Sequence, residues 1–301
     1  MSENTISIIF FGSDEFSTYV LSKLYSYKYI NILQIVTKKE KKSGRGGILQ
    51  SSPLVKLASH LNIPVIKVSS LLKNPKQLKN VSWNNFDYAV VASFGYIIPD
   101  EILGQMPNRF INVHPSLLPK YRGPSPIEHT IINGDTTTGN TIMILDSGID
   151  TGPILTQKSL KVGKNMTNLE LKKALATEGA KLLAKTLLDY KKGLIKPRKQ
   201  NDSNATYTKI FKRHDGFVTL QEPVHIIYNK YRAFMPWPGI YTTVKNLEDF
   251  AHIKTKIKDK NAIVKLIEVL LDSKGNLQIQ KVQLPNKKAI NWNDFLNGYT
   301  L

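Results

Sequence analysis

The sequence contains no cysteine, so it can form no disulfide, no thiolate metal site and no cysteine nucleophile. No apolar run approaches the roughly 20 residues that a membrane-spanning helix needs. The first residues, MSENTISIIFFG, lack the basic region and the apolar run of a secretory signal. We therefore expect a soluble, cytoplasmic protein that does not engage a membrane.

Acidic residues are scarce relative to basic ones. The chain of 301 residues has 42 Lys and Arg against 23 Asp and Glu, a net charge of +19. The basic residues gather in two groups, one made of Lys38, Lys39, Lys41, Lys42 and Arg45, the other including Lys196, Arg198, Lys199, Lys209, Lys212 and Arg213. Such a field attracts a polyanion, which favours nucleic acid or a phosphorylated substrate. Net charge alone does not exclude the alternative explanation, which is a surface generally rich in lysine without a polyanionic partner.

Glycine is sparse at the first predicted turn. Ile6–Phe11 is a nearly continuous apolar run that predicts a strand buried on both faces, and the turn that follows, GSDEF, has a single glycine. The three-glycine dinucleotide fingerprint is therefore missing, which argues against a nicotinamide dehydrogenase.

Predicted strands and helices alternate along the first two thirds of the chain, which is typical of a Rossmann-like α/β domain with a mostly parallel sheet. We expect further strands at Ile32–Val36, Pro64–Val68, Tyr88–Ala92, Phe110–Val113, Thr141–Leu145 and Ile154–Leu160, and helices at Phe16–Tyr25, Pro53–His60, Pro126–Asn133 and from Thr167 to about Tyr190. Residues 193–206 are polar and basic and predict an interdomain linker. After one helix, short β-prone runs predict a small antiparallel β-barrel of OB-like type. The expected domains are therefore 1–192 and 207–301.

Chemically specific residues concentrate between Phe110 and Pro153. Asn112 and His114, two residues apart on one predicted strand, share a side of it, and Pro115 ends the strand there. A neutral amide can donate to a developing oxyanion, and a histidine can donate or shuttle a proton near neutral pH. Asp150 could orient the histidine or accept a proton through water. The sequence therefore predicts a candidate acyl-transfer site.

Three other interpretations apply to the same residues. A histidine at a strand end can be purely structural, and residue type alone does not separate the two roles. A metal site with Asp146 and Asp150 is disfavoured, because no second histidine lies at a ligand-like spacing from His114. Ser116 as a nucleophile lacks a glycine-flanked elbow. We expect no metal.

The ordered motifs NVHPSLLPKYRG and DSGIDTG make the chain resemble the folate-dependent formyltransferases. Outside them, FFGSDEF, SFGYIIP, TYTKIFKRHDG and RAFMPWPG resemble the family members that act on methionyl-tRNA. The resemblance covers most of residues 5–245. Departures at Ser13 and at residues 218–220 lie outside the segment that carries Asn112, His114 and Asp150, so they leave the chemistry intact and affect only local contacts.

The resemblance implies transfer of a formyl group from 10-formyltetrahydrofolate, as donor cosubstrate, to the α-amine of methionyl initiator tRNA by a monomer. It assigns catalysis to Asn112, His114 and Asp150. The folate-binding residues that it implies are Phe94, Gly95, Tyr96, Ile97, Ile98, Ser116, Leu117, Leu118, Pro119, Asp146 and Gly148. The two basic groups match a family loop and linker, and are expected to bind tRNA. The resemblance also implies that residues 1–192 form the catalytic domain and that the C-terminal barrel, residues 207–301, helps to bind tRNA.

Two rival functions remain from the sequence. The first is a formyltransferase that acts on an amino sugar attached to a nucleotide, which shares the catalytic motifs. The second is a non-catalytic RNA-binding protein with the same fold. One-domain purine-pathway formyltransferases are disfavoured by length, since about a third of the chain would be unexplained.

Overall fold

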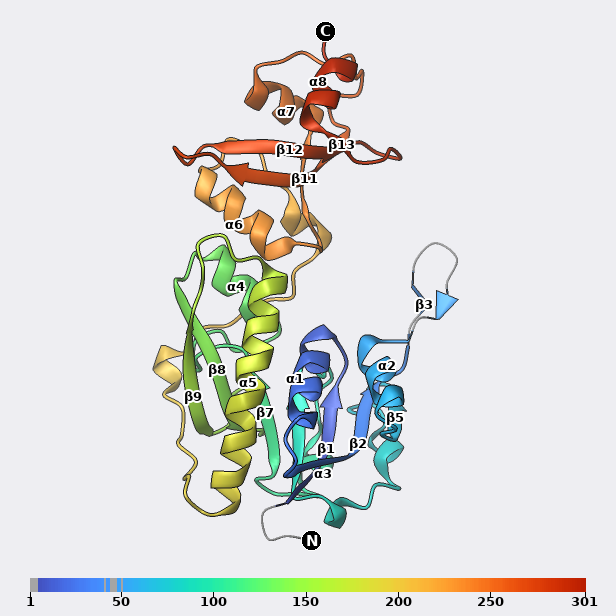
Figure 1. The fold of residues 1–301 in the computed structure, drawn as a ribbon, viewed down its shortest axis with the longest axis vertical. Helices are drawn as coiled ribbons and strands as arrows, with labels where there is room; N and C mark the ends of the chain where they lie inside the picture. The colour runs from blue at the N-terminus through green and yellow to red at the C-terminus, as the bar shows by residue number, and fades with distance from the viewer. Residues whose placement is uncertain (1–4, 41, 44–47, 50) are drawn as a thin grey trace. The chain divides into compact units, whose positions relative to one another are not determined.

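A seven-stranded sheet organises the first part of the chain. The computed structural model describes residues 5–40, 42–43, 48–49 and 51–301, and Figure 1 shows the ribbon. In spatial order the sheet is made of β5 (Val65–Val68), β2 (Ile30–Lys38), β1 (Ile6–Gly12), β6 (Tyr88–Ala92), β7 (Phe110–His114), β8 (Thr137–Ile144) and β9 (Ile154–Lys161). The pairs from β5 to β7 are parallel, and β8 and β9 join antiparallel. The predicted mostly parallel sheet is therefore confirmed.

The strand order reverses at β1, which pairs with both β2 and β6. Open α/β sheets bind ligands beyond the carboxyl ends of the strands at such a point. Here the turn after β1 and the loop after β6 are tied together. The Ser13 hydroxyl donates to the carbonyl of Phe94 at 3.0 Å, and the Ser93 hydroxyl donates to the carboxylate of Asp14 at 2.6 Å. These bonds fix one edge of the crevice.

Helices connect the strands of this sheet along the chain. They are α1 (Glu15–Tyr25), α2 (Pro53–His60), α3 (Asp100–Leu103), α4 (Pro126–Ile132) and α5 (Asn168–Lys191). Their starts follow the predicted signals: Asp14 caps α1, Ser52 caps α2 with Pro53 in the first turn, and Thr167 exchanges hydrogen bonds with Glu170 before α5. The four-residue α3 is too short to give a periodic pattern, and the sequence did not predict it.

Charged residues interrupt even the longest helix, α5. Within the described ranges, no helix combines the length and the apolar character of a membrane span.

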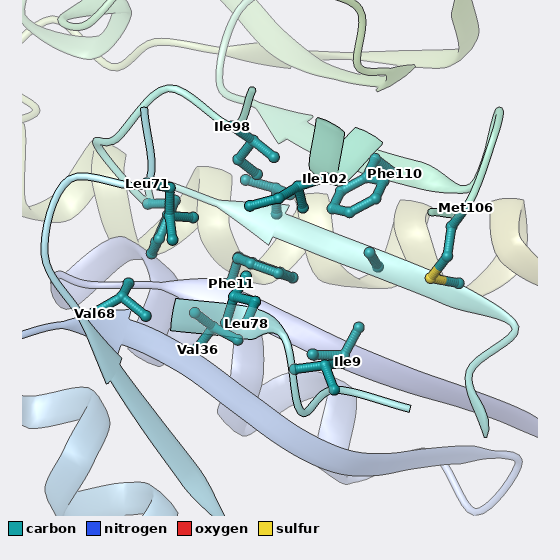
Figure 2. Close-up of a cluster of buried hydrophobic side chains, with 14 of the residues drawn as sticks. Ile9, Phe11, Val36, Val68, Leu71, Leu78, Ile98, Ile102, Met106 and Phe110 are labelled. Atoms are coloured by element: carbon teal, nitrogen blue, oxygen red, sulfur yellow. The ribbon is translucent and has the colours of Figure 1, made fainter. Parts of the chain in front are cut away.

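Aromatic and branched side chains fill one face of the parallel sheet (Figure 2). Phe11 of β1 and Phe110 of β7 have ring centroids 5.8 Å apart, and Phe94 meets Phe11 edge-on at 5.4 Å. Ile98 and Ile102 belong to the same cluster. The loop after β6 is therefore anchored in the core, so that its remaining residues are held at the carboxyl edge of the sheet.

A second sheet of four antiparallel strands follows, in the order β10 (Ile240–Thr243), β11 (Ile263–Leu271), β12 (Leu277–Gln283) and β13 (Ile290–Asn291). Helices α6 (Val224–Phe234), α7 (Val244–Ala251) and α8 (Trp292–Tyr299) accompany it. The expected small antiparallel unit is confirmed, whereas α7 and α8 were not predicted. The short pair β3 (Lys42–Ser43) and β4 (Ile48–Leu49) forms a separate sheet, and single 3₁₀ turns lie at Pro75–Leu78, Trp83–Asn85, Asp202–Asn204 and Arg213–Gly216.

The chain divides into two compact units. The first comprises the described parts of Met1–Pro126 with Thr137–Val162 and Lys172–Thr208, and the second comprises Ile127–Thr136, Gly163–Leu171 and Lys209–Leu301. Residues 193–206, which the sequence predicts as a linker, belong to the first unit, where Arg198 exchanges two backbone hydrogen bonds of 2.8 Å with Ile154. We keep the domain ranges 1–192 and 207–301 as a proposal.

Candidate active site

Strand β7 places Asn112 and His114 at its carboxyl end, in the interior of the sheet. Asn112 lies opposite Val91 of β6 and Met143 of β8, and His114 is the last residue of the strand, opposite Thr141. Their exposed fractions are 8% and 4%. The two side chains share one face of the strand, as predicted, because residues two apart point the same way.

Asp150 comes from the turn between β8 and β9 and lies against both residues. The Asn112 amide Nδ2 donates to Asp150 Oδ1 at 3.4 Å, and His114 Nδ1 lies 3.6 Å from the same oxygen. Asp150 Oδ2 accepts the backbone N–H of Gly123 at 2.8 Å. The structure therefore brings the three predicted catalytic residues together. Asp150 has φ = 53°, a left-handed conformation that aspartate tolerates better than most residues.

The hydrogen bonds of His114 fix the roles of its two ring nitrogens. Nε2 lies 2.9 Å from the backbone carbonyl oxygen of Tyr121. A carbonyl can only accept, so Nε2 carries hydrogen. Nδ1, on the other side of the ring, faces Asp150, so a hydrogen on Nδ1 would point toward that carboxylate. Contacts of this kind are often loose before substrate binds and tighten in the complex.

Further side chains hold the Asp150 turn in place, and sequence reasoning did not find them as a set. Gln200 Nε2 donates at 2.8 Å to the carbonyls of Asp150 and Gly152, while its Oε1 accepts from Arg122 at 2.9 and 3.1 Å. Arg122 also donates to Asp202 at 2.7 Å. Gln200 lies in the segment predicted as a linker. Because residues 193–206 are polar and have no hydrophobic period, the sequence does not indicate that Gln200 holds the Asp150 turn.

Arg122 is 1% exposed. Burial acts to lower the pKa of its guanidinium, but hydrogen bonds to Asp202 and Tyr207 outweigh burial and raise the pKa above its usual value. Arg122 therefore remains charged and can orient Gln200.

Glycines permit the close approach of these segments. Gly123, which donates to Asp150, has φ = 105°, and a Cβ there would lie 2.8 Å from Thr208 Oγ1. A Cβ at Gly152 would overlap the carbonyl oxygen of Ile144. Any side chain at either position would therefore displace the turn that carries Asp150.

Gln200→Ala is expected to lower the free energy of unfolding by about 1–3 kcal/mol, because two buried carbonyls and a buried guanidinium lose a partner. The turnover number should also fall, because the Asp150 turn loses its anchor. Urea unfolding and steady-state kinetics measure both. Gln105→Ala is the control, since Gln105 makes one exposed side-chain bond to Glu101. An unchanged turnover number in folded Gln200→Ala would show that Gln200 does not position Asp150.

The segments predicted to bind folate adjoin one another in the first unit. Leu145, directly before Asp146, packs against the cluster that contains Phe94 and Ile98 and against the cluster that contains Leu118. Asp146 accepts hydrogen bonds from Gly148 N at 3.2 Å and from the Thr151 hydroxyl at 2.7 Å, which closes the turn. A cavity of about 320 Å³ is lined by Asp146, Ser147, Leu145, Phe110 and residues of α3.

The individual side chains of these segments differ in exposure. Phe94, Ile98, Ser116 and Leu118 are buried, Tyr96, Leu117 and Pro119 are half-buried, and Ile97 is 58% exposed. Gly95, Asp146 and Gly148 are exposed. Phe94 and Ile98 therefore serve the core, and the exposed members of each segment are the ones free to meet a ligand.

The predicted tRNA-binding residues fall into different parts of the structure. Lys38, at the end of β2, lies over the ring of Tyr96 at 4.7 Å, which places it beside a predicted folate-binding residue. Lys39 is exposed. Lys41, Arg45 and the side chain of Lys42 lie outside the described residues. Lys196, Arg198 and Lys199 belong to the first unit, and Lys209, Lys212 and Arg213 belong to the second.

In the part of the chain that the structure describes, no group of three or more His, Asp or Glu side chains could hold a metal ion.

Comparison with known proteins assigns both parts of the chain. Residues 5–187 match the family model described as "Formyl transferase", and residues 210–300 match "Formyl transferase, C-terminal domain". The chain is 36% identical over 297 residues to the methionyl-tRNA formyltransferase of Thermodesulfovibrio yellowstonii, covering 97% of this chain and 95% of that protein. It is 35% identical over 300 residues to the methionyl-tRNA formyltransferase of Rickettsia bellii, covering 98% and 97%.

A solved structure with the same fold is the N-formyltransferase of Helicobacter canadensis in complex with folinic acid and dTDP-3-aminofucose. Its TM-score is 0.59 at 18% identity, over 98% of this chain and 97% of that one.

Proposed function

The chain belongs to the formyl transferase family, and we propose that it transfers the formyl group of 10-formyltetrahydrofolate to the α-amino group of methionyl initiator tRNA. The observation that carries the proposal is the contact of Asp150 with both Asn112 and His114 at the carboxyl end of β7. The full-length similarity to methionyl-tRNA formyltransferases supports the choice of acceptor. The proposal includes action as a monomer in the cytoplasm.

Folate supplies the activated formyl group, and the residues present fit such a donor. The cavity lined by Asp146 and Ser147 lies beside the turn that carries Asp150. Asn112 can donate from Nδ2, and His114, whose Nε2–H is bound to the Tyr121 carbonyl, can donate from Nδ1 when a hydrogen is there. Both side chains are nearly buried, so water competes weakly for their hydrogens. We propose that both side chains donate hydrogen bonds to the formyl oxygen and stabilise the negative charge that develops on it.

The reaction forms a bond between the methionyl nitrogen and the formyl carbon and breaks the bond from that carbon to the folate nitrogen. The attacking amine must be neutral and must lose a proton. Asp150 is placed to orient His114 and to take that proton, directly or through water, and the leaving nitrogen of folate takes up a proton in return. The net proton count of the site is therefore unchanged after one turnover.

An RNA acceptor accounts for the charge of the chain, which is +19. Each phosphate that a Lys or Arg neutralises releases counterions and makes binding depend on salt. A nucleotide-linked amino sugar carries too few phosphates to require the first basic group, Lys38, Lys39, Lys41, Lys42 and Arg45. A non-catalytic RNA-binding protein would need the charge but not the three catalytic residues.

Neutralising Lys39, Lys41, Lys42 and Arg45 to glutamine is expected to raise KM for methionyl-tRNA. It should also flatten the dependence of kcat/KM on salt, by about one unit of log–log slope for each phosphate that the variant no longer neutralises. Lys38 is left unchanged because it lies on the ring of Tyr96. Kinetics between about 50 and 200 mM salt measure the effect.

The matched control neutralises four exposed lysines elsewhere in the first unit: Lys56, Lys73, Lys76 and Lys79. It should change the slope less than the loop variant does. If the salt dependence of kcat/KM has the same slope in both variants, Lys39, Lys41, Lys42 and Arg45 contribute no more to tRNA binding than other exposed lysines do. Formylation of a nucleotide-linked amino sugar in preference to methionyl-tRNA would favour the rival enzyme.

A further inference from the structure

A second cavity, of about 430 Å³, lies wholly within the second unit. Its lining includes Arg213, Trp237, Tyr241, Ile263 and Lys265. The volume is within the range of small-molecule sites. None of its lining residues belongs to the candidate active site described above, and no part of the proposed chemistry uses it.

The register of β10 and β11 explains how the cavity is built. Tyr241 pairs with Lys265, and Thr243 pairs with Ile263. Their neighbours Ile240, Val264 and Leu266 are buried in the core of the unit. Because side chains alternate along a strand, Tyr241, Lys265 and Ile263 face the other side of the sheet. They line the cavity, which also touches the buried residues Ile240 and Leu266.

Trp237 is 62% exposed at the rim. An exposed indole presents a flat apolar face on which a planar group can stack. The Tyr241 ring packs on Phe217 at 5.7 Å and is therefore held in place. The cavity thus combines one accessible indole with one ordered tyrosine ring.

Two cations complete the lining. Arg213 and Lys265 are exposed, and neither makes an ion pair with the described residues. The nearby Asp215 is bound to Lys209 at 2.7 Å, which lowers the pKa of its carboxyl through that hydrogen bond. Among the described residues, no aspartate or glutamate lines the cavity. The cavity therefore suits an anionic group joined to a flat apolar ring.

We propose that this cavity binds one unpaired nucleotide of an RNA, with the base stacked on Trp237 and its phosphate bound by Arg213 and Lys265. Stacking on an aromatic side chain together with charge along the backbone is how proteins hold single-stranded nucleic acid. The inference rests on the proposed function, which supplies an RNA substrate. It adds a binding site that the basic groups of the sequence did not include, because Trp237 and Lys265 lie outside them.

The direct test uses the full chain and the single-stranded trinucleotide CCA with a 5′ phosphate, followed by tryptophan fluorescence. We expect saturable quenching by CCA that Arg213→Ala removes. Lys274→Ala is the control, because Lys274 is exposed in the same unit but does not line the cavity. Cytidine monophosphate should quench more weakly than the trinucleotide. Equal quenching by the mononucleotide would point to a free nucleotide ligand and overturn the RNA assignment.

Steady-state formylation separates this inference from the function on which it rests. Trp237→Leu should lower kcat/KM for methionyl-tRNA by about 5- to 150-fold, the equivalent of one stacked base, with kcat at saturating tRNA unchanged. Trp237→Phe should restore most of the loss. If wild type formylates methionyl-tRNA but Trp237→Leu and Arg213→Ala keep a normal KM, the cavity is not a nucleotide site. If the wild-type chain does not formylate methionyl-tRNA, the proposed function is wrong. In that case the fluorescence titration with CCA alone tests whether the cavity binds a nucleotide.

Discussion

Asp150→Asn is expected to lower the turnover number by about 10²- to 10⁴-fold, the usual contribution of a residue that manages a proton. The substitution conserves the size of the side chain. It can still accept the N–H of Gly123, which now lies 2.8 Å from Oδ2. It removes the charge that faces His114 Nδ1 at 3.6 Å.

Because the hydrogen bond to Gly123 survives, the fold should be nearly unchanged and KM for both substrates should move little. The measurement is single-turnover formyl transfer at saturating concentrations of folate donor and methionyl-tRNA. Asp189→Asn is the control, since Asp189 is an ion-paired carboxylate of α5 in the same unit, bound to Lys185 at 2.8 Å. Near-normal turnover in Asp150→Asn would exclude Asp150 from catalysis.

Asn112→Ala is expected to lower turnover by about 10²- to 10³-fold, which is the cost of losing one oxyanion donor. The loss should fall on kcat, because the bond to the formyl oxygen strengthens as charge develops there. The resting bond from Asn112 to Asp150 is long, at 3.4 Å. It contributes little to stability, so the variant should remain folded.

Asn140→Ala is the matched control for this variant. Asn140 lies on the adjoining strand β8 with an exposed fraction of 2%, so its removal truncates an equally buried amide outside the site. Kinetics and thermal unfolding of both variants separate loss of catalysis from loss of packing. Turnover of Asn112→Ala that matches the control would exclude Asn112 as an oxyanion donor.

Strong local signals account for the parts of the fold that the sequence predicted well. The apolar run at Ile6–Phe11 and the capped helix at Pro53–His60 appear in the structure within a residue of their predicted bounds. Helices α7 and α8 have eight residues each, as α2 has, but they lie among β-prone runs and lack the proline in the first turn that marks the start of α2.

The candidate site was partly readable from the sequence. The spacing of Asn112 and His114 requires both to lie on one face of a strand. Residue chemistry suggested Asp150, 36 residues beyond His114 in the sequence, as a partner, and the family resemblance assigned it to catalysis with them. Gln200 and Trp237 could not be assigned, because their roles arise from pairings distant in the chain. Gln200 reaches Asp150 across 50 residues. The position of Lys38 on Tyr96 is likewise a tertiary contact without a local signal.

Formyl transfer to charged tRNA tests the central claim most directly. The purified chain is mixed with 10-formyltetrahydrofolate and either initiator or elongator methionyl-tRNA, and the formylmethionyl product is measured after release from the tRNA. We expect rapid formylation of the initiator species and much slower formylation of the elongator species. No formylmethionine from either tRNA, with folded protein and intact folate, would contradict it.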